Sequence, residues 1–208
     1  MKKIILSCAA ALFCFLSNAQ VAPMTALNSG EISSLAEVKK VNIVYDYSDL
    51  GVGAFRKEQD YIDKRYKELE EKEKGRGDKF KESWINDRKK SFEPHFEELF
   101  KKYAEKDINM TGTNYSTDNE YTLVVHTVFI EPGVNIGIYR KPAYIDLECT
   151  FQDKTGKALC VFFVKNAVGA QAMGFDYDVT SRLVESYGKA AKMLVGGVAK
   201  ERKKSGKK

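Results

Sequence analysis

Apolar and polar positions follow a strand-like pattern between positions 121 and 165, and this stretch predicts the centre of the fold. Valine, isoleucine, tyrosine and phenylalanine are dense there, and these residue types favour β-strands. The first expected strand is apolar at both alternations, with Val125 on one side and Val124 on the other, which predicts cover on both faces. The three expected strands are YTLVVHTVFIE, AYIDLECTFQD and KALCVFFVK.

Two flanking segments complete the predicted core. The sequence VKKVNIVYDY alternates, with Val41, Ile43 and Tyr45 on one face, and predicts an earlier strand. Residues 179–199 place apolar side chains at helical spacing and predict a C-terminal amphipathic helix. The pattern therefore predicts a single α+β domain over residues 38–199, with a mixed sheet of about four strands: the earlier strand plus a three-strand antiparallel meander.

Between the first strand and the meander, residues 55–106 predict a long, heavily charged helical excursion. The two glycines of Gly75-Arg-Gly77 predict a break in this excursion. Pro94 lacks the donor that a helix interior needs, and Ser91 could cap a restart, so a kink or break is expected around residues 90–93. Apolar residues in the second half, all but one of them aromatic, form an aromatic stripe that is interpreted as core, with a docking surface as the alternative. They are Phe80, Trp84, Phe92, Phe96, Leu99 and Tyr103.

The first nineteen residues predict where the protein is located. Two lysines precede an apolar run over residues 4–16, and small residues end at Ala19, which is typical of a secretory signal peptide. Residues 1–19 are therefore predicted to be removed and the chain exported to the periplasm or cell surface. Residues 20–37 are expected to form an extended N-terminal arm.

Positive charge is concentrated at the C-terminus. The chain holds 34 Lys and Arg against 29 Asp and Glu, and two of the lysines lie in the predicted signal peptide. The segment 200–208 alone carries a net charge of +5 and is expected to be a disordered basic tail, while the rest of the mature chain is near −2. A nucleic-acid partner is therefore not expected. Weak contact with an anionic membrane surface is a candidate role of Lys203, Lys204, Lys207 and Lys208.

Two cysteines remain after the predicted cleavage, and the hairpin between the last two strands decides whether they pair. A two-residue turn would place Cys149 opposite Cys160. A type I turn with a bulge at Gly156 would pair Cys160 with Thr150 and point Cys149 to the other face. The glycine favours the bulged turn, which predicts free, buried cysteines.

No motif for catalysis, a cofactor or a metal is recognised. Gly51-Val-Gly53 lacks the third glycine of a dinucleotide fingerprint, and a strand-to-helix turn explains it. His95 and His126 have no ligand spacing around them, and His126 is interpreted as a neutral core residue. Catalytic groups brought together from distant positions are the alternative, so an enzyme of hydrolase type is kept as a second hypothesis.

Topology suggests one end of the sheet for partner binding. If the first strand is parallel to the second, the loops 49–54, 132–142 and 166–178 emerge together, opposite the turn at residues 153–156. They carry apolar and charged residues that a solvated turn does not need, with capping of the core as the alternative. The candidate partner-binding residues are Leu50, Val52, Ile136, Tyr139, Arg140, Met173, Phe175 and Asp176.

The hairpin Asp153-x-x-Gly-Lys, followed by a closing helix with R-L-V-E-S-Y-G-K-A-A-K, resembles small exported envelope proteins of Gram-negative bacteria. Among these are the N-terminal domain of TolB and the curli-secretion lipoprotein. The stretches V-Y-D-Y-S-D, G-R-G-D-K-F, E-P-G-V-N-I-G and A-M-G-F-D resemble uncharacterised secreted proteins. The resemblance implies helices packed on a sheet and carries over no catalytic residue. The leading hypothesis is a secreted or periplasmic non-enzymatic module that binds a protein or another envelope component.

Overall fold

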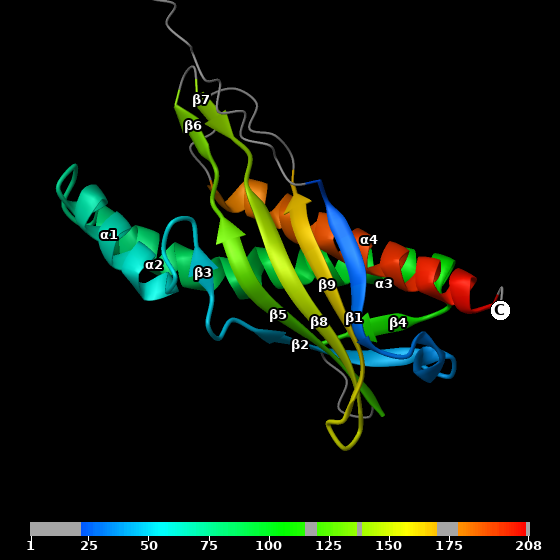
Figure 1. The fold of residues 1–208 in the computed structure, drawn as a ribbon. Helices are drawn as coiled ribbons and strands as arrows, with labels where there is room; N and C mark the ends of the chain where they lie inside the picture. The colour runs from blue at the N-terminus through cyan, green and yellow to red at the C-terminus, as the bar shows by residue number, and fades with distance from the viewer. Residues whose placement is uncertain (1–21, 115–119, 137–138, 170–178, 207–208) are drawn as a thin grey trace, which may run out of the picture.

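The computed structural model describes residues 22–114, 120–136, 139–169 and 179–206 of the 208 in the chain. A seven-stranded mixed sheet runs in the order β1-β9-β8-β5-β2-β4, with the short β3 beside β5, and β6 and β7 form a separate hairpin (Figure 1). The strands are β1 Met24–Gly30, β2 Lys40–Asp46, β3 Gly51–Val52, β4 Thr111–Thr113, β5 Tyr121–Glu131, β6 Val134–Ile136, β7 Tyr139–Lys141, β8 Tyr144–Asp153 and β9 Ala158–Val168.

The predicted α+β class is confirmed, whereas the predicted count of about four strands in the sheet is too low. The additional strands come from segments with weak alternation. The expected N-terminal arm contains β1, which pairs antiparallel with β9 and places Ala26 opposite Phe163. An edge strand of this kind is held by backbone hydrogen bonds, so its small and polar side chains give no hydrophobic signal.

The helical excursion has the predicted break and the predicted irregularity. Gly75, at φ 83°, follows the first helix, a left-handed conformation that suits glycine. The second irregularity is a π-helical turn and not a restart capped by Ser91, because the next helix begins directly after it with Pro94 in its first turn. The helical elements are η1 Ile32–Leu35, α1 Glu58–Glu70, α2 Arg76–Asp87, η2 Arg88–Phe92, α3 Glu93–Asp107 and α4 Val179–Ser205.

Helices α3 and α4 pack side by side and cover one face of the sheet, while α1 and α2 extend past the β3 end (Figure 1). The core lies between these layers and is continuous, so the described residues form one domain. It includes Phe96 and Phe100 of α3, Leu194 of α4, and Leu147 and Phe162 of the sheet, each fully buried. The interpretation of the aromatic stripe as core is correct for its central members.

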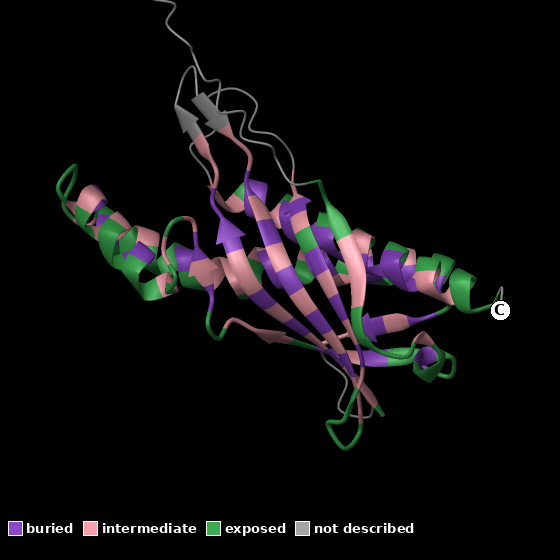
Figure 2. Cartoon of the chain, viewed as in Figure 1, coloured by how far each residue is buried: buried purple, intermediate pink, exposed green. Residues whose placement is uncertain are grey.

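The prediction that the central strand is covered on both faces is wrong. Buried and half-buried positions alternate along β5, with Leu123 and Val125 fully buried and Val124 half-buried (Figure 2). A bulge after Thr127 shifts the alternation, so Ile130 rather than Phe129 enters the core. Helices pack on only one face of this sheet, and β-branched residues on the other face fit a half-solvated antiparallel surface.

Both cysteines are free and buried, as predicted, but they do not point to opposite faces. The bulged turn is present, with Gly156 at φ 83° and the Gly156 amide donating to the Asp153 carbonyl. A second register shift at Leu159 then places Cys160 opposite Phe151 and Cys149 opposite Phe162. Both thiols therefore lie on the core face as diagonal neighbours. Cys149 acts as a small apolar side chain, whereas the Cys160 thiol donates to the Glu31 carbonyl oxygen at 3.0 Å.

Candidate functional site

The described parts of the loops that were predicted to share one end of the sheet lie at that end, while residues 137–138 and 170–178 of these loops fall outside the described residues. Strand β2 is parallel to β5, with Val44 opposite Val124, and β5 is antiparallel to β8. The loop after β2, the segment carrying β6 and β7, and the end of β9 therefore lie opposite the turn at residues 153–157 (Figure 1). The condition on which this prediction depended, a parallel first pair, is met.

Two of the residues predicted to bind a partner at this end are core residues instead. Leu50 is 2% exposed and Val52 is fully buried. Residues 51–52 form β3, which pairs with Phe129 and Ile130 of β5, and this pairing carries both apolar side chains inward. The alternative of core capping is therefore correct for these two positions.

The other predicted partner-binding side chains fall outside what the structure describes. This group stays a prediction. It consists of Ile136, Tyr139 and Arg140, whose backbones belong to the β6–β7 hairpin, and of Met173, Phe175 and Asp176.

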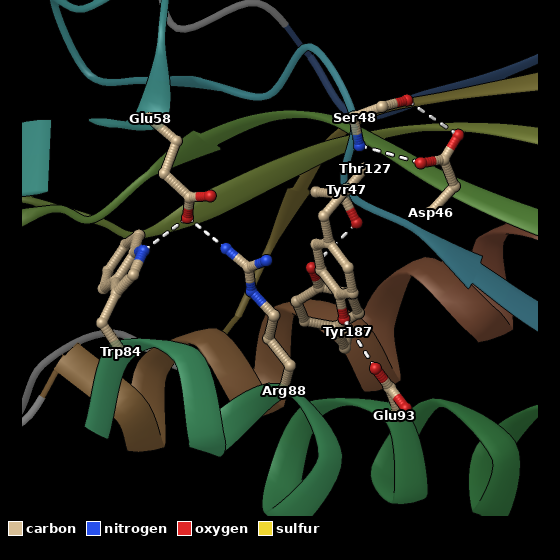
Figure 3. A network of polar contacts seen from close by, with 9 residues as sticks. All are labelled: Asp46, Tyr47, Ser48, Glu58, Trp84, Arg88, Glu93, Thr127 and Tyr187. Atoms are coloured by element: carbon tan, nitrogen blue, oxygen red, sulfur yellow. Dashed lines mark hydrogen bonds and ion pairs between the residues drawn. The ribbon is translucent and has the colours of Figure 1, made fainter. Parts of the chain in front are cut away.

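A polar cluster links the sheet to the helices in the interior (Figure 3). The Tyr47 hydroxyl donates to Glu93 Oε1 at 3.3 Å, and the hydroxyls of Tyr187 and Thr127 lie 2.9 Å apart. Beside them the Arg88 guanidinium lies 4.2 Å from the centroid of the Tyr47 ring. The same guanidinium pairs with Glu58, whose carboxylate also accepts from Trp84 Nε1 at 2.5 Å.

Burial shifts several pKa values in this cluster. It raises the pKa of Tyr187 to about 12 and raises the pKa of Tyr47 further still. It also raises the pKa of the Glu93 and Glu97 carboxyls, and in Glu97 the nearby charge of Glu93 adds to the rise. Folding therefore shifts the equilibrium of each of these groups toward its neutral form.

Shifted pKa values often mark catalytic sites, but here they accompany closed packing. Two grooves on the described surface, of about 750 and 610 Å³, include none of Tyr47, Glu93 and Tyr187 in their lining. The hydrogen-bonding atoms of these three residues face other members of the cluster. His126 is half-buried, and its Nε2 lies 2.8 Å from the Ser48 carbonyl oxygen. The described residues contain no group of three or more His, Cys, Asp or Glu suited to a metal, and no described helix is long and apolar enough to cross a membrane.

The Glu93 carboxyl makes the stability of the folded protein depend on pH, with stability falling as pH rises. Because its pKa is raised in the folded state, its neutral form contributes stability at low pH that is lost as pH rises through the folded pKa. Glu93→Gln keeps an oxygen for the Tyr47 hydroxyl and cannot ionise. Its free energy of unfolding should therefore rise relative to the unmodified protein between pH 4 and pH 8.

Urea unfolding of both proteins at several pH values measures this difference. Arg88 and Lys89, whose charges lower the pKa of Glu93, are present in both, as are Tyr47 and Glu97. Glu82→Gln, at an exposed position of α2, is the matched control and should show no such trend. A Glu93→Gln difference that stays constant or falls with pH would contradict the assignment.

A groove with a volume of about 750 Å³ lies between the C-terminal ends of α3 and α4. Lys106 of α3 and Lys200, Lys203 and Lys204 of α4 line it, together with Asp107, Gly196 and Ala199. Two of these lysines were predicted to contact a membrane. The other two of that set, Lys207 and Lys208, lie outside the described residues. We call this groove, with its lining lysines Lys106, Lys200, Lys203 and Lys204, the basic groove.

Both helices end at this groove because they run in the same direction. His95 near the start of α3 lies 4.0 Å from Glu185 near the start of α4, while Lys106 and Lys200 meet at the other end. Helix C-termini carry partial negative charge, so lysines are well placed there. Lys204 pairs with Glu201 at 2.6 Å, and no ion pair of the described residues engages Lys106, Lys200 or Lys203.

Arg202 fixes this end of α4 to the domain. Its guanidinium donates to the carbonyl oxygens of Ile108, at 2.5 Å, and Leu35, at 2.7 Å, which end α3 and η1. Burial lowers the pKa of Arg202 from its ordinary value. The prediction of a disordered tail from residue 200 is therefore wrong for residues 200–205, which are helical.

The sequence holds a signal for this anchor that charge counting misses. Val195 and Val198 lie on the buried stripe of α4, and Arg202 follows Val198 at a spacing of four, on the same face. Charge alone groups this arginine with the neighbouring lysines as one solvated run. Burial of the long arginine stem with its head on two carbonyls is the pattern that separates Arg202 from its neighbours.

The known proteins that resemble this chain do so only weakly. No family model matches the chain, and no curated protein matches it. Among solved structures, a PelC dodecamer from Paraburkholderia phytofirmans matches with a TM-score of 0.37 and 9% identity, covering 80% of this chain and 97% of that one. A second PelC dodecamer structure from the same organism gives a TM-score of 0.35 and 10% identity, covering 82% and 99%.

Similarity at this level supports no inference about function, partners or assembly. The resemblance to the TolB and curli-secretion type of domain also gains no support from these comparisons and stays a prediction. The functional interpretation therefore depends on the chain's own surface.

Proposed function

We propose that this protein is an exported, non-enzymatic binding module that contacts an anionic lipid surface through the basic groove. The observation that carries the proposal is the placement of four lysines on the joined ends of two helices. Arg202 holds these ends in place, so the lysines are presented by a fixed surface and not by a loose tail. Little backbone order has to be gained when such a surface binds.

The energetics favour a weak and reversible contact. A basic side chain near an anionic leaflet contributes roughly 1 kcal/mol, and salt screens the attraction beyond roughly 8 Å at physiological ionic strength. Asp107 in the groove and Glu201 beside Lys204 offset part of the positive charge. A net attraction of about 2 to 3 kcal/mol follows from these values, enough to orient the protein on a membrane but not to anchor it.

Charge asymmetry supports the same orientation. With the predicted signal peptide removed, the chain outside residues 200–208 is near −2, so positive charge is localised at the end that carries the groove. A protein with this charge distribution approaches a negatively charged surface with its basic groove facing that surface. The predicted secretory leader supplies the route to an envelope membrane, and its residues lie outside those that the structure describes.

Charge reversal in the groove tests the proposal. Lys203→Glu with Lys204→Glu changes exposed side chains only, and should lower affinity for vesicles of phosphatidylglycerol and phosphatidylcholine at least tenfold. Truncation after Ala199 is unsuitable because it also removes Arg202. Co-sedimentation of the protein without residues 1–19 measures the affinity.

Two controls accompany this measurement. Lys67→Glu with Lys72→Glu makes the same charge change on and just after α1, far from the groove, and should retain most of the binding (Figure 1). Vesicles of phosphatidylcholine alone should bind neither form. Equal sedimentation of the groove variant and the unmodified protein would remove the proposal.

A further inference from the structure

A second groove lies on a different part of the molecule and is independent of the basic groove. It has a volume of about 610 Å³ and is bounded by α1, α2, the π-helical turn and the first turn of α4. It shares no lining residue with the basic groove. We call it the α2–α4 groove.

The floor of the α2–α4 groove is aromatic and rigid. The Tyr61 ring lies 5.0 Å from the Trp84 ring and 6.1 Å from the Phe80 ring, centroid to centroid. Trp84 is 6% exposed and its Nε1 is held by Glu58, so the floor does not depend on the groove being filled. Phe80 is only partly buried and presents apolar surface to solvent. Such a surface accepts an apolar side chain without prior rearrangement.

The rim of the α2–α4 groove is cationic. Arg65, Arg76 and Lys79 line it, and Arg76 and Lys79 are exposed. Glu68 pairs with Arg65 at 2.7 Å, which orients that guanidinium. The acidic lining residue is Asp87, and its Oδ2 already accepts from the Thr180 hydroxyl at 2.6 Å. The lining of the groove therefore carries three cationic side chains and one carboxylate, a net positive charge around an apolar floor.

We propose that the α2–α4 groove binds an acidic peptide segment of a partner protein, with one apolar side chain on the aromatic floor and flanking carboxylates on the cationic rim. Charge complementarity selects the acids, because Arg76 and Lys79 attract carboxylates and repel basic segments. The form of the groove selects a peptide. Small-molecule sites enclose most of their ligand, whereas this groove is open along its length and is walled by helices.

Selection from a library of random nine-residue peptides displayed on phage tests this proposal without presuming a sequence. The target is the protein without residues 1–19. Selected peptides should be enriched in Asp and Glu around an aromatic or aliphatic residue. Synthetic peptides of the selected sequences should then bind Arg76→Glu with Lys79→Glu at least tenfold more weakly than the unmodified protein, as measured by fluorescence anisotropy.

The basic-groove variant, Lys203→Glu with Lys204→Glu, is the control and should bind the same peptides with unchanged affinity. Peptides without acidic enrichment would overturn the proposal, as would acidic peptides that bind the Arg76→Glu, Lys79→Glu variant equally well. Loss of vesicle binding by that variant would also overturn it, by making the groove a lipid site. If the basic groove fails to bind vesicles, the expected peptide binding in the α2–α4 groove is unaffected. The two proposals can therefore fail independently of each other.

Discussion

Replacement of Arg202 by alanine is expected to lower the free energy of unfolding by about 3 kcal/mol, a large effect for a residue in a highly charged C-terminal segment. Each hydrogen bond from a charged group contributes roughly 1.5 to 3 kcal/mol. Removal of the guanidinium leaves the carbonyl oxygens of Ile108 and Leu35, near the interior, without this hydrogen-bond donor. Urea unfolding followed by the fluorescence of Trp84, the single tryptophan, measures the change.

Two further substitutions separate the anchor from the general charge of the segment. Arg202→Lys keeps the charge, but an ammonium group lacks the forked guanidinium that reaches both carbonyl oxygens. Its loss of free energy of unfolding should therefore be about half that of Arg202→Ala. Lys203→Ala, at an exposed position one residue further, should change the free energy of unfolding by less than about 0.5 kcal/mol. An Arg202→Ala loss as small as that of Lys203→Ala would show that the segment is not anchored.

Phe96→Ala is expected to lower the free energy of unfolding by about 4 kcal/mol. For a chain of this size, this loss lowers the melting temperature by roughly 10 °C. The Phe96 ring is fully buried, lies edge-on to Tyr45 at 6.0 Å between centroids, and stacks on Phe100 at 6.1 Å. Its removal leaves a cavity between α3 and the sheet that neighbouring rings fill only in part.

Differential scanning calorimetry measures this loss and decides between the two interpretations of the aromatic stripe. Tyr103→Ala is the matched control, because Tyr103 is partly exposed and contacts the ammonium groups of Lys102 and Lys192. It should cost about 1 kcal/mol. A docking surface would behave in the opposite way, with Phe96→Ala leaving the melting temperature nearly unchanged.

The elements that the sequence predicted well are those whose own side chains specify them. Strands β5, β8 and β9 are dense in β-branched and aromatic residues, and their observed bounds lie within three residues of the prediction. Gly75 supplies the left-handed residue directly before α2, in the break between the first two helices, which is a local requirement. The parallel pairing of β2 with β5 entered the prediction as a condition that a helical crossover between sheet neighbours allows, and the structure meets it.

The elements that escaped prediction depend on partners far away in the chain. Strand β1 exists because β9 offers an open edge, and its own residues show little alternation. The register shift at Leu159 turned both thiols onto one face, and a local turn rule could not include it. The inward pairing of β3 buried Leu50 and Val52, so apolar loop residues that suggested binding serve the core instead.

The candidate site shows the same division. The lysines were recognised as basic residues of the C-terminus, but their value as a site depends on α4 continuing to Ser205 and on Lys106 arriving from α3. The α2–α4 groove needs four separate segments to meet. Sequence reasoning found the charges and the aromatic rings, and only the tertiary structure places them on common surfaces.

The most direct test of the proposed function is whether the basic groove itself touches the lipid. Gly196 lines this groove and is exposed, and a side chain added there would meet open space, with no neighbouring atom within 4 Å of its Cβ. Gly196→Cys therefore accommodates a nitrobenzoxadiazole label without disturbing α4. The same label on Lys154→Cys, in the turn between β8 and β9, serves as the reference. Cys149 and Cys160 are buried and stay unlabelled in the folded protein.

On addition of phosphatidylglycerol vesicles, the label at position 196 should brighten and shift to shorter wavelength as it leaves water, and added salt should reverse the change. The label at position 154 should not respond. An unchanged spectrum at position 196 under conditions where the protein co-sediments with the vesicles, or an equal response at both positions, would contradict a lipid contact through the basic groove.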